Sequence, residues 1–220
     1  ITAGNASVMT GNGGGMFSLE GSPTLRNLIF RENNAREYGG GMYNWNGSDT
    51  RLYNCVFFNN SAENFGGGIF NSASSPLIVN CSFCRNRADD GGAALYNTTG
   101  SNPTITNTIM WADSTDFMGL AEILNQNSSY PVISYSCIQY CGGSGTGWKG
   151  KYGIDGGNNT DSDPYYVYTA TGDLHLREGS NASDAGDSTV YGVPDTDSEG
   201  SPRIQGSNID LGAYEGEYNK

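Results

Sequence analysis

Three acidic side chains near the C-terminus have the spacing of a calcium-binding loop. Asp195, Asp197 and Glu199 stand at alternate positions and are followed by Gly200, which permits a tight turn. Carboxylate oxygens at alternate positions are ligands that Ca²⁺ prefers. The twelfth position of such a loop, which holds a bidentate glutamate in the full motif, is Gly206. Two interpretations stand, Ca²⁺ as a cofactor or a solvated turn, and the second is favoured.

Five cysteines offer thiol chemistry. Cys55 and Cys81 stand at equivalent positions of two sequence repeats, which would place their Cα atoms about 5 Å apart, within disulfide range. A pair of stacked, buried free thiols fits the same spacing equally well. Cys137 and Cys141 share one segment and would close a small ring. We expect Cys84 to point outward, where an odd thiol of a secreted protein can pair between molecules.

Sugar-related chemistry is the third candidate. Asn-x-Ser/Thr sequons, the acceptors of N-linked glycans, occur at Asn5, Asn46, Asn59, Asn97, Asn127, Asn158, Asn181 and Asn80. We expect Asn80 to be buried and the sequons in turns to be suitable attachment points. Indole rings are platforms for sugar stacking, and the candidates are Trp45, Trp111 and Trp148. The alternative, in which these rings cover turns and outer faces, is favoured.

Residues that would indicate catalysis are scarce. His175, the single histidine, alternates with leucines, so we interpret it as an exposed strand residue rather than a metal ligand. A polysaccharide lyase needs an acidic calcium cluster with a basic residue nearby, and a glycosidase needs two facing carboxylates. The arginines and glutamates of the repeats form no columns that would enforce such pairs. We therefore expect no enzyme activity, and a polysaccharide lyase or glycoside hydrolase remains an alternative.

The candidate residues are positioned by a sequence repeat. The phrase Gly39-Gly40-Gly41-Met42-Tyr43-Asn44 returns at residues 13–17, 66–71 and 91–97. A second phrase, Asn80-Cys81-Ser82-Phe83 in its clearest form, places asparagine at positions 27, 54, 80 and 107. A fixed period of about 26 residues indicates stacked repeats.

The repeat unit is a coil of short strands. Segments between the glycines are β-branched and aromatic and alternate between two faces, which predicts an all-β parallel β-helix, a solenoid with strands about 4.8 Å apart. Equivalent residues would form ladders. We expect an internal apolar stack of Phe30, Phe57, Phe83 and Met110 and an internal amide ladder of Asn27, Asn54, Asn80 and Asn107. Asparagine tolerates the left-handed backbone of such a corner, and the glycine triplets allow positive φ or close approach.

The 220 residues form one predicted domain. Residues 13–112 hold the regular coils, 113–157 an irregular coil and a Gly-rich loop, and 158–220 the C-terminal coils. Residues 117–124 suggest a short helix or an irregular coil. The chain starts in mid-coil without a signal peptide, as a processed form or a fragment would, and no cap is evident at its end.

The net charge of the chain restricts the classes of binding partner. The formal net charge is −12, which argues against nucleic acid and anionic membrane surfaces. No apolar run approaches the roughly 20 residues of a transmembrane helix.

The second half contains motifs of a known group. Residues 163–167 and 172–176, the motif Asp184-Ala185-Gly186-Asp187, Arg203-Ile204 and the ending Ile209-Asp210-Leu211-Gly212-Ala213-Tyr214-Glu215 resemble the C-terminal end of secreted bacterial right-handed parallel β-helix proteins. The Gly-Gly-Gly-Ile-Phe-Asn and Asn-Cys-x-Phe-x-x-Asn phrases are similar to repeats of polymorphic outer-membrane proteins. The resemblance implies a right-handed coil and an extracellular or cell-surface location, and it does not indicate one activity.

These features lead to one main functional hypothesis. We expect an extracellular structural or cell-surface β-helix that self-associates, because two unpaired end faces can stack head to tail into a filament. The alternative is an adhesin or carbohydrate-binding passenger domain that contacts surface glycans.

Overall fold

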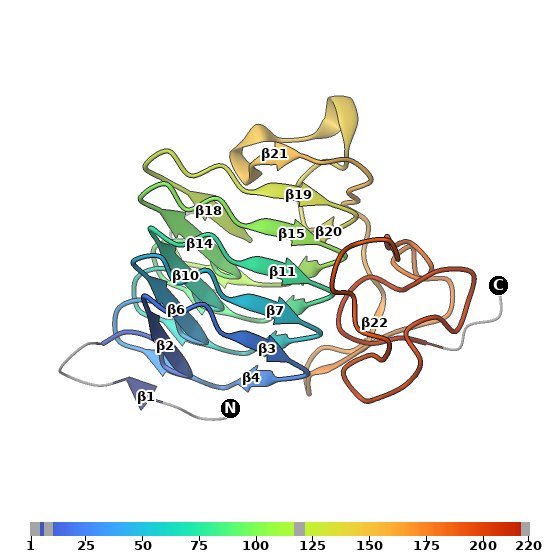
Figure 1. Ribbon diagram of the computed structural model, residues 1–220, viewed down its shortest axis with the longest axis horizontal. Helices are drawn as coiled ribbons and strands as arrows, with labels where there is room; N and C mark the ends of the chain where they lie inside the picture. Colours follow the sequence, from blue (N-terminus) through green and yellow to red (C-terminus); the bar gives the residue numbers. More distant parts are fainter. Residues whose placement is uncertain (1–4, 7–10, 117–121, 217–220) are drawn as a thin grey trace.

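The computed structural model describes residues 5–6, 11–116 and 122–216. Their strands wind into a parallel β-helix whose coils stack along one axis (Figure 1). Phe57 pairs with Phe30 on one neighbouring coil and with Phe83 on the other, so each coil takes about 27 residues. The predicted all-β solenoid is confirmed. Among the described residues the only helical segments are the 3₁₀ turns η1 (Gly145–Gly147) and η2 (Gly150–Tyr152).

Each regular coil contributes one strand to each of four parallel sheets. The first sheet contains β2 (Met16–Leu19), β6 (Met42–Trp45), β10 (Ile69–Ser72), β14 (Leu95–Thr98) and β18 (Ile123–Asn125). The second contains β3 (Thr24–Arg26), β7 (Arg51–Tyr53), β11 (Leu77–Val79), β15 (Thr104–Thr106), β19 (Val132–Ser134) and β21 (Ile154–Asp155).

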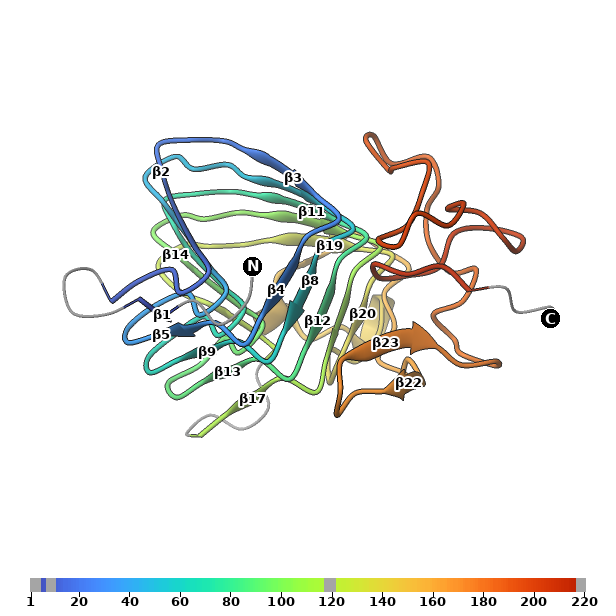
Figure 2. The same ribbon diagram turned by 90° about the horizontal axis from the view of Figure 1, so that it is seen from below.

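The other two sheets complete the coil. The third sheet contains β4 (Ile29–Arg31), β8 (Val56–Phe58), β12 (Ser82–Cys84), β16 (Ile109–Trp111) and β20 (Cys137–Ile138). The fourth contains β1 (Asn5–Ala6), β5 (Asn34–Ala35), β9 (Ser61–Ala62), β13 (Arg87–Ala88) and β17 (Ser114–Thr115) and projects from one side of the coil (Figure 2). Residues 117–121, part of the segment for which a short helix was considered, lie outside the described residues, and Ile123 and Leu124 belong to strand β18.

Corners with left-handed backbone join the first three sheets. Asn27, Asn54, Asn80 and Asn107 turn the chain from the second sheet to the third at φ of 53°, 51°, 50° and 53°. Asparagine adopts this conformation at lower cost than most residues, so the repeated Asn marks the corner. The glycine phrase acts by close approach, because a Cβ on Gly40 would lie 2.4 Å from the carbonyl oxygen of Ser61.

The internal apolar stack is confirmed. Phe30, Phe57, Phe83 and Met110 are fully buried. The rings of Phe30 and Phe57 lie 4.6 Å apart at an angle of 2°, and those of Phe57 and Phe83 lie 4.7 Å apart at 3°. Alternation places the residues on either side of each phenylalanine on the outer face of the third sheet.

The predicted internal amide ladder is wrong in its direction. Asn54, Asn80 and Asn107 face outward from the coil and are buried because the C-terminal part of the chain covers them, while Asn27 is exposed. Two of the expected amide bonds between coils are present, from Asn54 to Asn27 at 3.1 Å and from Asn107 to Asn80 at 3.4 Å. Two other columns form the continuous buried ladders, in which each amide donates to the next coil. One is Asn44–Asn71–Asn97–Asn125, with distances of 2.9, 2.9 and 2.8 Å, and the other is Asn33–Asn60–Asn86–Asp113, with the same distances.

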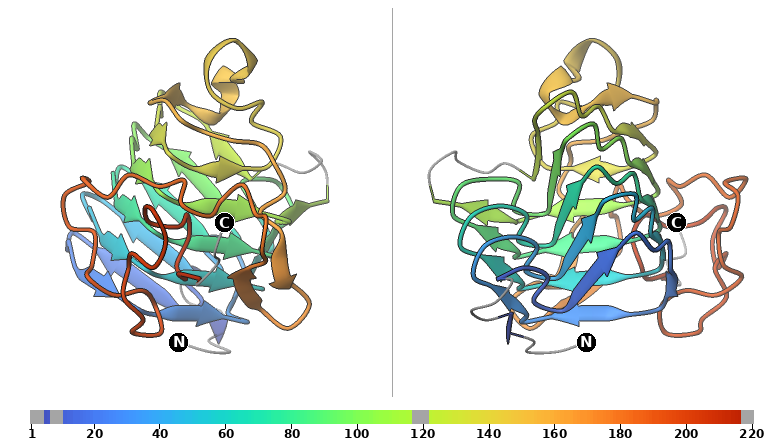
Figure 3. Two further views of the ribbon diagram at one scale, coloured as in Figure 1. Left: turned by 90° about the vertical axis from the view of Figure 1, so that its right-hand side faces the viewer. Right: turned by 60° about the vertical axis from the view of Figure 1, so that its left-hand side comes forward.

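Residues 161–216, here called the C-terminal clasp, differ from the expected C-terminal coils. They leave the coil and pack along its side (Figures 1 and 3), and their regular structure is the antiparallel pair β22 (Tyr166–Tyr168) and β23 (Asp173–Leu176). Leu174, Leu176 and Leu211 cover Val56 and Ile109 on the outer face of the third sheet. One hairpin and irregular segments therefore replace the C-terminal coils that the sequence predicts.

The Gly-rich segment closes the end of the coil that β21 forms. Trp148 and Tyr152 pack against the internal core, and the Trp148 indole N–H donates to the carbonyl of Gly153 at 2.9 Å. The expectation that this end lacks a cap is therefore wrong. At the opposite end of the core, Met16, Leu25 and Leu28 are only partly buried.

Candidate functional site

A depression lies where the third sheet turns toward the fourth and the clasp crosses it. Its volume is about 260 Å³, and its lining is Trp111, Ala112, Asp163, Tyr165, Tyr166, Thr169 and Arg177. Trp111 faces outward because Met110, its neighbour in β16, points into the core. The clasp covers Ile109 and leaves the Trp111 ring half-buried at the rim.

Hydrogen bonds fix the clasp wall of this depression. Tyr165 has a φ of 52° and is half-exposed, and its backbone N–H donates to Asp163 Oδ1 at 2.8 Å. The Arg177 N–H donates to the carbonyl of Tyr165 at 2.9 Å, and its guanidinium donates to the carbonyl of Val167. The aromatic ring and the cation are therefore presented by one ordered hairpin.

The depression continues along the corner. A neighbouring hollow of about 340 Å³ shares Ala112 and is lined further by Asn59, Arg85, Arg87 and Ser114. Asn59, Arg85 and Ala112 stand at the same left-handed corner of successive coils, with φ of 52°, 59° and 66°. We call the two hollows together the corner groove. Salt bridges to Asp89 and Asp116 neutralise Arg87.

The corner groove combines two aromatic side chains with hydrogen-bonding groups. Trp111 and Tyr165 come from the coil and the clasp, and Arg177, Arg85 and Asn59 add donors. A concave site with apolar surfaces and a few placed polar groups is typical of small-molecule recognition. Sequence reasoning found Trp111 and missed Tyr165 and Arg177, because only the fold brings the clasp against this corner.

The predicted calcium ligands serve other contacts. Asp197 is fully buried, and its Oδ1 accepts the N–H groups of Glu199 at 2.9 Å and Ser201 at 2.8 Å. Glu199 instead approaches His175 Nε2 at 3.4 Å, while His175 Nδ1 lies 2.7 Å from Asp173. Across the described ranges, no three His, Cys, Asp or Glu side chains are arranged to hold a metal. Calcium binding by Asp195, Asp197 and Glu199 stays a prediction without a converging ligand set.

The five cysteines are buried free thiols, so the structure contains neither predicted disulfide. Cys55 and Cys81 are stacked as expected, since the Cys55 N–H donates to Cys81 Sγ at 3.4 Å, and each thiol donates to a carbonyl of its own coil. Cys137 and Cys141 do not close a ring, because Cys137 packs under the clasp and Cys141 packs in the internal core. Cys84 points out of the coil as expected but is buried under the clasp, which removes it from intermolecular pairing.

Most candidate glycosylation sites are on the surface. The exposed ones are Asn46, Asn59, Asn127, Asn158 and Asn181, and Asn5 lies in strand β1. Asn97 is a correction, because its side chain is fully buried in an amide ladder and donates to Asn125. Asn80 is buried as expected.

The three candidate stacking rings do not share a surface. Trp45 is exposed on the outer face of the first sheet beside Phe17, with ring centroids 6.3 Å apart. Trp148 belongs to the cap of the core, and Trp111 lines the corner groove. Trp111 lines its hollow together with Tyr165, Asp163 and Arg177.

The recognised ending motif holds the clasp together. Arg203 is buried and its Nη2 donates to the carbonyls of Asp210 at 3.2 Å and Gly212 at 2.5 Å. The Asp210 carboxylate accepts the N–H groups of Asp184 at 2.8 Å and Gly216 at 3.0 Å. Burial raises the pKa of Glu215 to about 8. These residues have a structural role in the described part of the chain.

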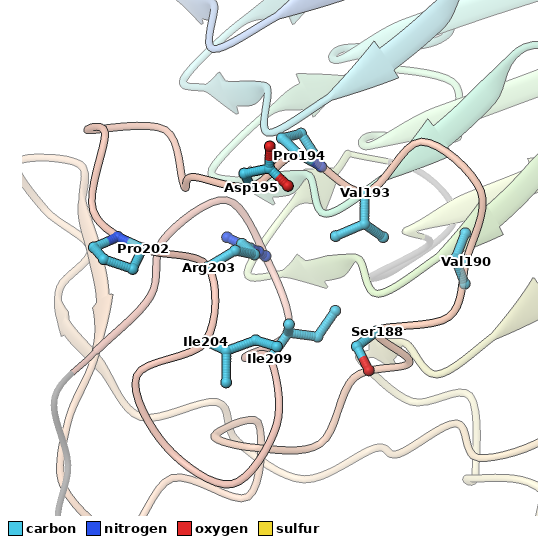
Figure 4. A pocket seen from close by; sticks show the side chains of 9 residues that line it. All are labelled: Ser188, Val190, Val193, Pro194, Asp195, Pro202, Arg203, Ile204 and Ile209. Atoms are coloured by element: carbon cyan, nitrogen blue, oxygen red, sulfur yellow. The ribbon is translucent and has the colours of Figure 1, made fainter.

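A pocket of about 370 Å³ opens inside the clasp beside this network (Figure 4). Its lining is mostly aliphatic, with Val190, Val193 and Ile209 around the Arg203 side chain. Nη2 of Arg203 donates to two backbone carbonyls, whereas its Nε and Nη1 are buried without a hydrogen-bond partner among the described residues, and Asp195 and Ser188 also line the pocket.

A buried carboxyl pair ends one amide ladder. Asp113 Oδ1 accepts the Asn86 backbone N–H at 2.5 Å and its side-chain amide at 2.8 Å, and Glu122 Oε1 accepts the Asp113 N–H at 3.4 Å. Burial raises the pKa of Asp113 to about 6, and burial together with the Asp113 charge raises the pKa of Glu122 well above its usual range. The buried site therefore favours the protonated, neutral form of Glu122. The repeat period could have identified Asp113 as a buried residue, because it continues the column of Asn33, Asn60 and Asn86.

Comparison with known protein families supports the β-helix fold. A family model described as the right-handed beta helix region matches residues 3–115, which is half of the chain. The chain belongs to the right-handed β-helix family. In this β-helix protein the match ends at β17, so the clasp and the Gly-rich cap lie beyond it. No curated protein and no solved structure matches the chain. No helix in the described ranges has the length and apolar character needed to cross a membrane.

Proposed function

We propose that this β-helix protein acts outside the cell or at its surface and binds carbohydrate in the corner groove. The observation that carries the proposal is the placement of Trp111 and Tyr165 in one hollow with Asp163 and Arg177. Sugar rings stack their apolar faces on aromatic side chains, and their hydroxyls need donors and acceptors at the edge. The remaining length of the groove, past Arg85 and Asn59, would accommodate further sugar units.

Three features support an external location. The glycine phrases and the Ile209–Glu215 ending resemble polymorphic outer-membrane proteins and surface-anchored β-helix proteins, and a net charge of −12 suits a soluble surface rod. The exposed sequons outside the groove, at Asn46, Asn127, Asn158 and Asn181, would carry glycans without disturbing the core.

We propose binding without turnover. The described lining of the groove contains one carboxylate, Asp163, and its Oδ1 already accepts the Tyr165 N–H. Glycoside hydrolysis by the common mechanisms needs two carboxyl groups on either side of the scissile bond. Asp163 alone is suited to accept a hydrogen bond from a sugar hydroxyl.

Self-association is a second proposal and is restricted to one face. At the β2–β3–β4 end, Met16, Leu25 and Leu28 are partly exposed, whereas Trp148 and Tyr152 cover the other end. A contact that uses one face on each copy closes as a dimer rather than a filament. Sedimentation of the wild type and of Leu28→Asp would test it. A concentration-dependent dimer that the variant abolishes supports the proposal, and a wild-type monomer at all concentrations contradicts it.

A glycan array tests the carbohydrate proposal. Trp111→Ala and Tyr165→Asn remove one stacking ring each, and asparagine retains the left-handed backbone at position 165. We expect each variant to bind the recognised glycan about tenfold more weakly, as loss of one stacked ring implies. Trp45→Ala removes an exposed indole on the first sheet, away from the groove, and should bind normally. Absence of any glycan signal, or equal loss in all three variants, would refute the proposal.

A further inference from the structure

A second surface concentrates positive charge on this acidic protein. It is a pocket of about 350 Å³ in the crease between the second sheet and the clasp, lined by Thr24, Arg26, Arg51, Tyr53, Tyr191 and Gly192. We call it the arginine pocket. It lies on strands β3 and β7, which belong to a different wall of the coil from β16 of the corner groove.

The parallel register places both arginines on the same outer face. Thr24 pairs with Arg51 and Arg26 pairs with Tyr53, while Leu25 and Leu52 between them face the core. Arg26 and Arg51 are therefore diagonal neighbours. A strand spacing of about 4.8 Å and a rise of about 3.3 Å per residue put their Cα atoms about 8 Å apart.

Arg26 is held in position before any ligand binds. Its guanidinium carbon lies 4.0 Å from the centre of the Tyr53 ring, and its Nη1 donates to the carbonyl of Gly192 at 3.4 Å. Gly192 can approach this closely because it has no side chain: a Cβ there would lie 2.6 Å from Tyr53 Oη. The planar guanidinium is thus held on one wall, and Arg51 is exposed on the neighbouring strand.

The two charges lack acidic partners. No carboxylate lines the pocket, and among the described residues neither arginine forms a salt bridge. By contrast, Arg31 pairs with Glu32, and Arg87 pairs with Asp89 and Asp116. The chain has a net charge of −12, yet this small surface carries two guanidinium groups without acidic partners among the described residues. The local positive charge therefore favours binding of an anion.

We propose that the arginine pocket binds a phosphate or sulfate group carried by a larger ligand. Guanidinium groups match such oxyanions with paired N–H donors, and a fixed fork loses little entropy on binding. The volume of about 350 Å³ exceeds what one small anion fills, since a water molecule occupies about 30 Å³ in the liquid. Tyr191, which is 89% exposed at the rim, would contact the rest of the ligand.

The proposal stands apart from the carbohydrate proposal, because no residue is shared between the two sites. Calorimetric titration at constant ionic strength tests it with four probes: inorganic phosphate, inorganic sulfate, dextran sulfate and uncharged dextran. We expect dextran sulfate to bind, the inorganic ions to compete with it, and dextran to be inert. Tight binding of the inorganic ions alone would support the anion site and identify the free ion as the ligand.

Variants make the test specific to the pocket. Arg51→Gln removes an exposed side chain with no hydrogen bond to the rest of the protein in the described structure, so it should fold normally and weaken dextran sulfate binding at least tenfold. Arg26→Gln should act similarly, with its melting temperature measured because Tyr53 and Gly192 lose a partner. Arg36→Gln, an exposed arginine elsewhere, makes the same change in net charge. Failure of every anionic probe to bind, or equal weakening by Arg36→Gln and Arg51→Gln, would overturn the proposal.

Discussion

Asn107 of the coil and Asp187 of the clasp exchange two hydrogen bonds. The Asp187 N–H donates to Asn107 Oδ1 at 2.8 Å, and Asn107 Nδ2 donates to the Asp187 carbonyl at 3.0 Å. Asn54 and Asn80 likewise donate to the carbonyls of Thr196 and Asp210. The asparagine column that turns each coil thus also attaches the clasp, and the clasp supplies one wall of the corner groove.

Removal of one of these amides should loosen the clasp. Asn107→Gly keeps a residue that accepts a φ of 53° but leaves buried groups of the clasp without partners. We expect a loss of about 2–6 kcal/mol in the free energy of unfolding, from the two lost hydrogen bonds to the clasp at about 1–3 kcal/mol each. Limited proteolysis should then cut residues 161–216 first. Asn59→Gly, an exposed left-handed asparagine, is the control and should change stability by less than 1 kcal/mol, a rough bound for surface sites.

The close packing of the Ile209–Glu215 motif predicts that any side chain at Gly212 destabilises the fold. A Cβ there would lie 2.7 Å from Ser82 Oγ and 3.1 Å from Ile109 Cδ1. Gly212→Ala should cost about 1–2 kcal/mol for its left-handed backbone and about 1–3 kcal/mol more for the clash. Gly200 has a similar φ of 93° but open space around it, so Gly200→Ala should show the first cost alone. Equal denaturant midpoints for the two variants would show that the clasp does not contact the sheet at Gly212.

The phenylalanine stack should be the main source of core stability. Phe57→Ala removes a fully buried ring between two others, and we expect a loss of about 3–5 kcal/mol, measured by urea unfolding. Phe17→Ala, at a ring that is 40% exposed, should cost about 1 kcal/mol or less. Similar losses for the two variants would contradict the internal position of the stack.

The Asp113–Glu122 pair predicts that stability falls as pH rises. Both carboxyl groups have raised pKa values in the fold, so the fold binds protons that the unfolded chain releases. The stabilisation is complete below about pH 4, declines as pH passes the Asp113 value of about 6, and continues to decline as Glu122 ionises. Asp113 alone accounts for a change on the order of 3 kcal/mol.

Glu122→Gln isolates this effect. The amide cannot ionise, so we expect a higher melting temperature than the wild type at pH 8 and a smaller difference at pH 5. Asp90→Asn makes the same carboxyl-to-amide change at an exposed position and is the matched control. A wild-type profile that rises between pH 6 and pH 8 would contradict the assignment.

The repeat made the coil predictable from sequence, because period and alternation specify which residues stack. Phe30, Phe57 and Phe83 follow that rule, and their stacking is confirmed. The direction of the Asn54 side chain was not predictable, since a corner residue can turn inward or outward and the choice depends on what covers it. Here a segment more than 100 residues later in the chain, at Thr196, provides the cover.

The clasp explains the remaining differences. Cys84 and Ile109 alternate outward as the pattern predicts, and they are buried only because Tyr166, Leu174 and Leu211 pack on them. Tyr165 and Arg177 enter the corner groove for the same reason. The clasp has no repeat, so the sequence does not indicate which clasp residues contact which strands of the coil. Of Trp111, Tyr165 and Arg177, which line the corner groove, sequence reasoning therefore identified Trp111 alone.

The most direct test of the account is a crystal structure of the protein with a glycan that the array identifies. We predict density for a sugar ring between Trp111 and Tyr165, with a polar group within hydrogen-bond distance of Arg177. Density on Trp45 or inside the clasp, with the corner groove occupied only by solvent, would contradict the account.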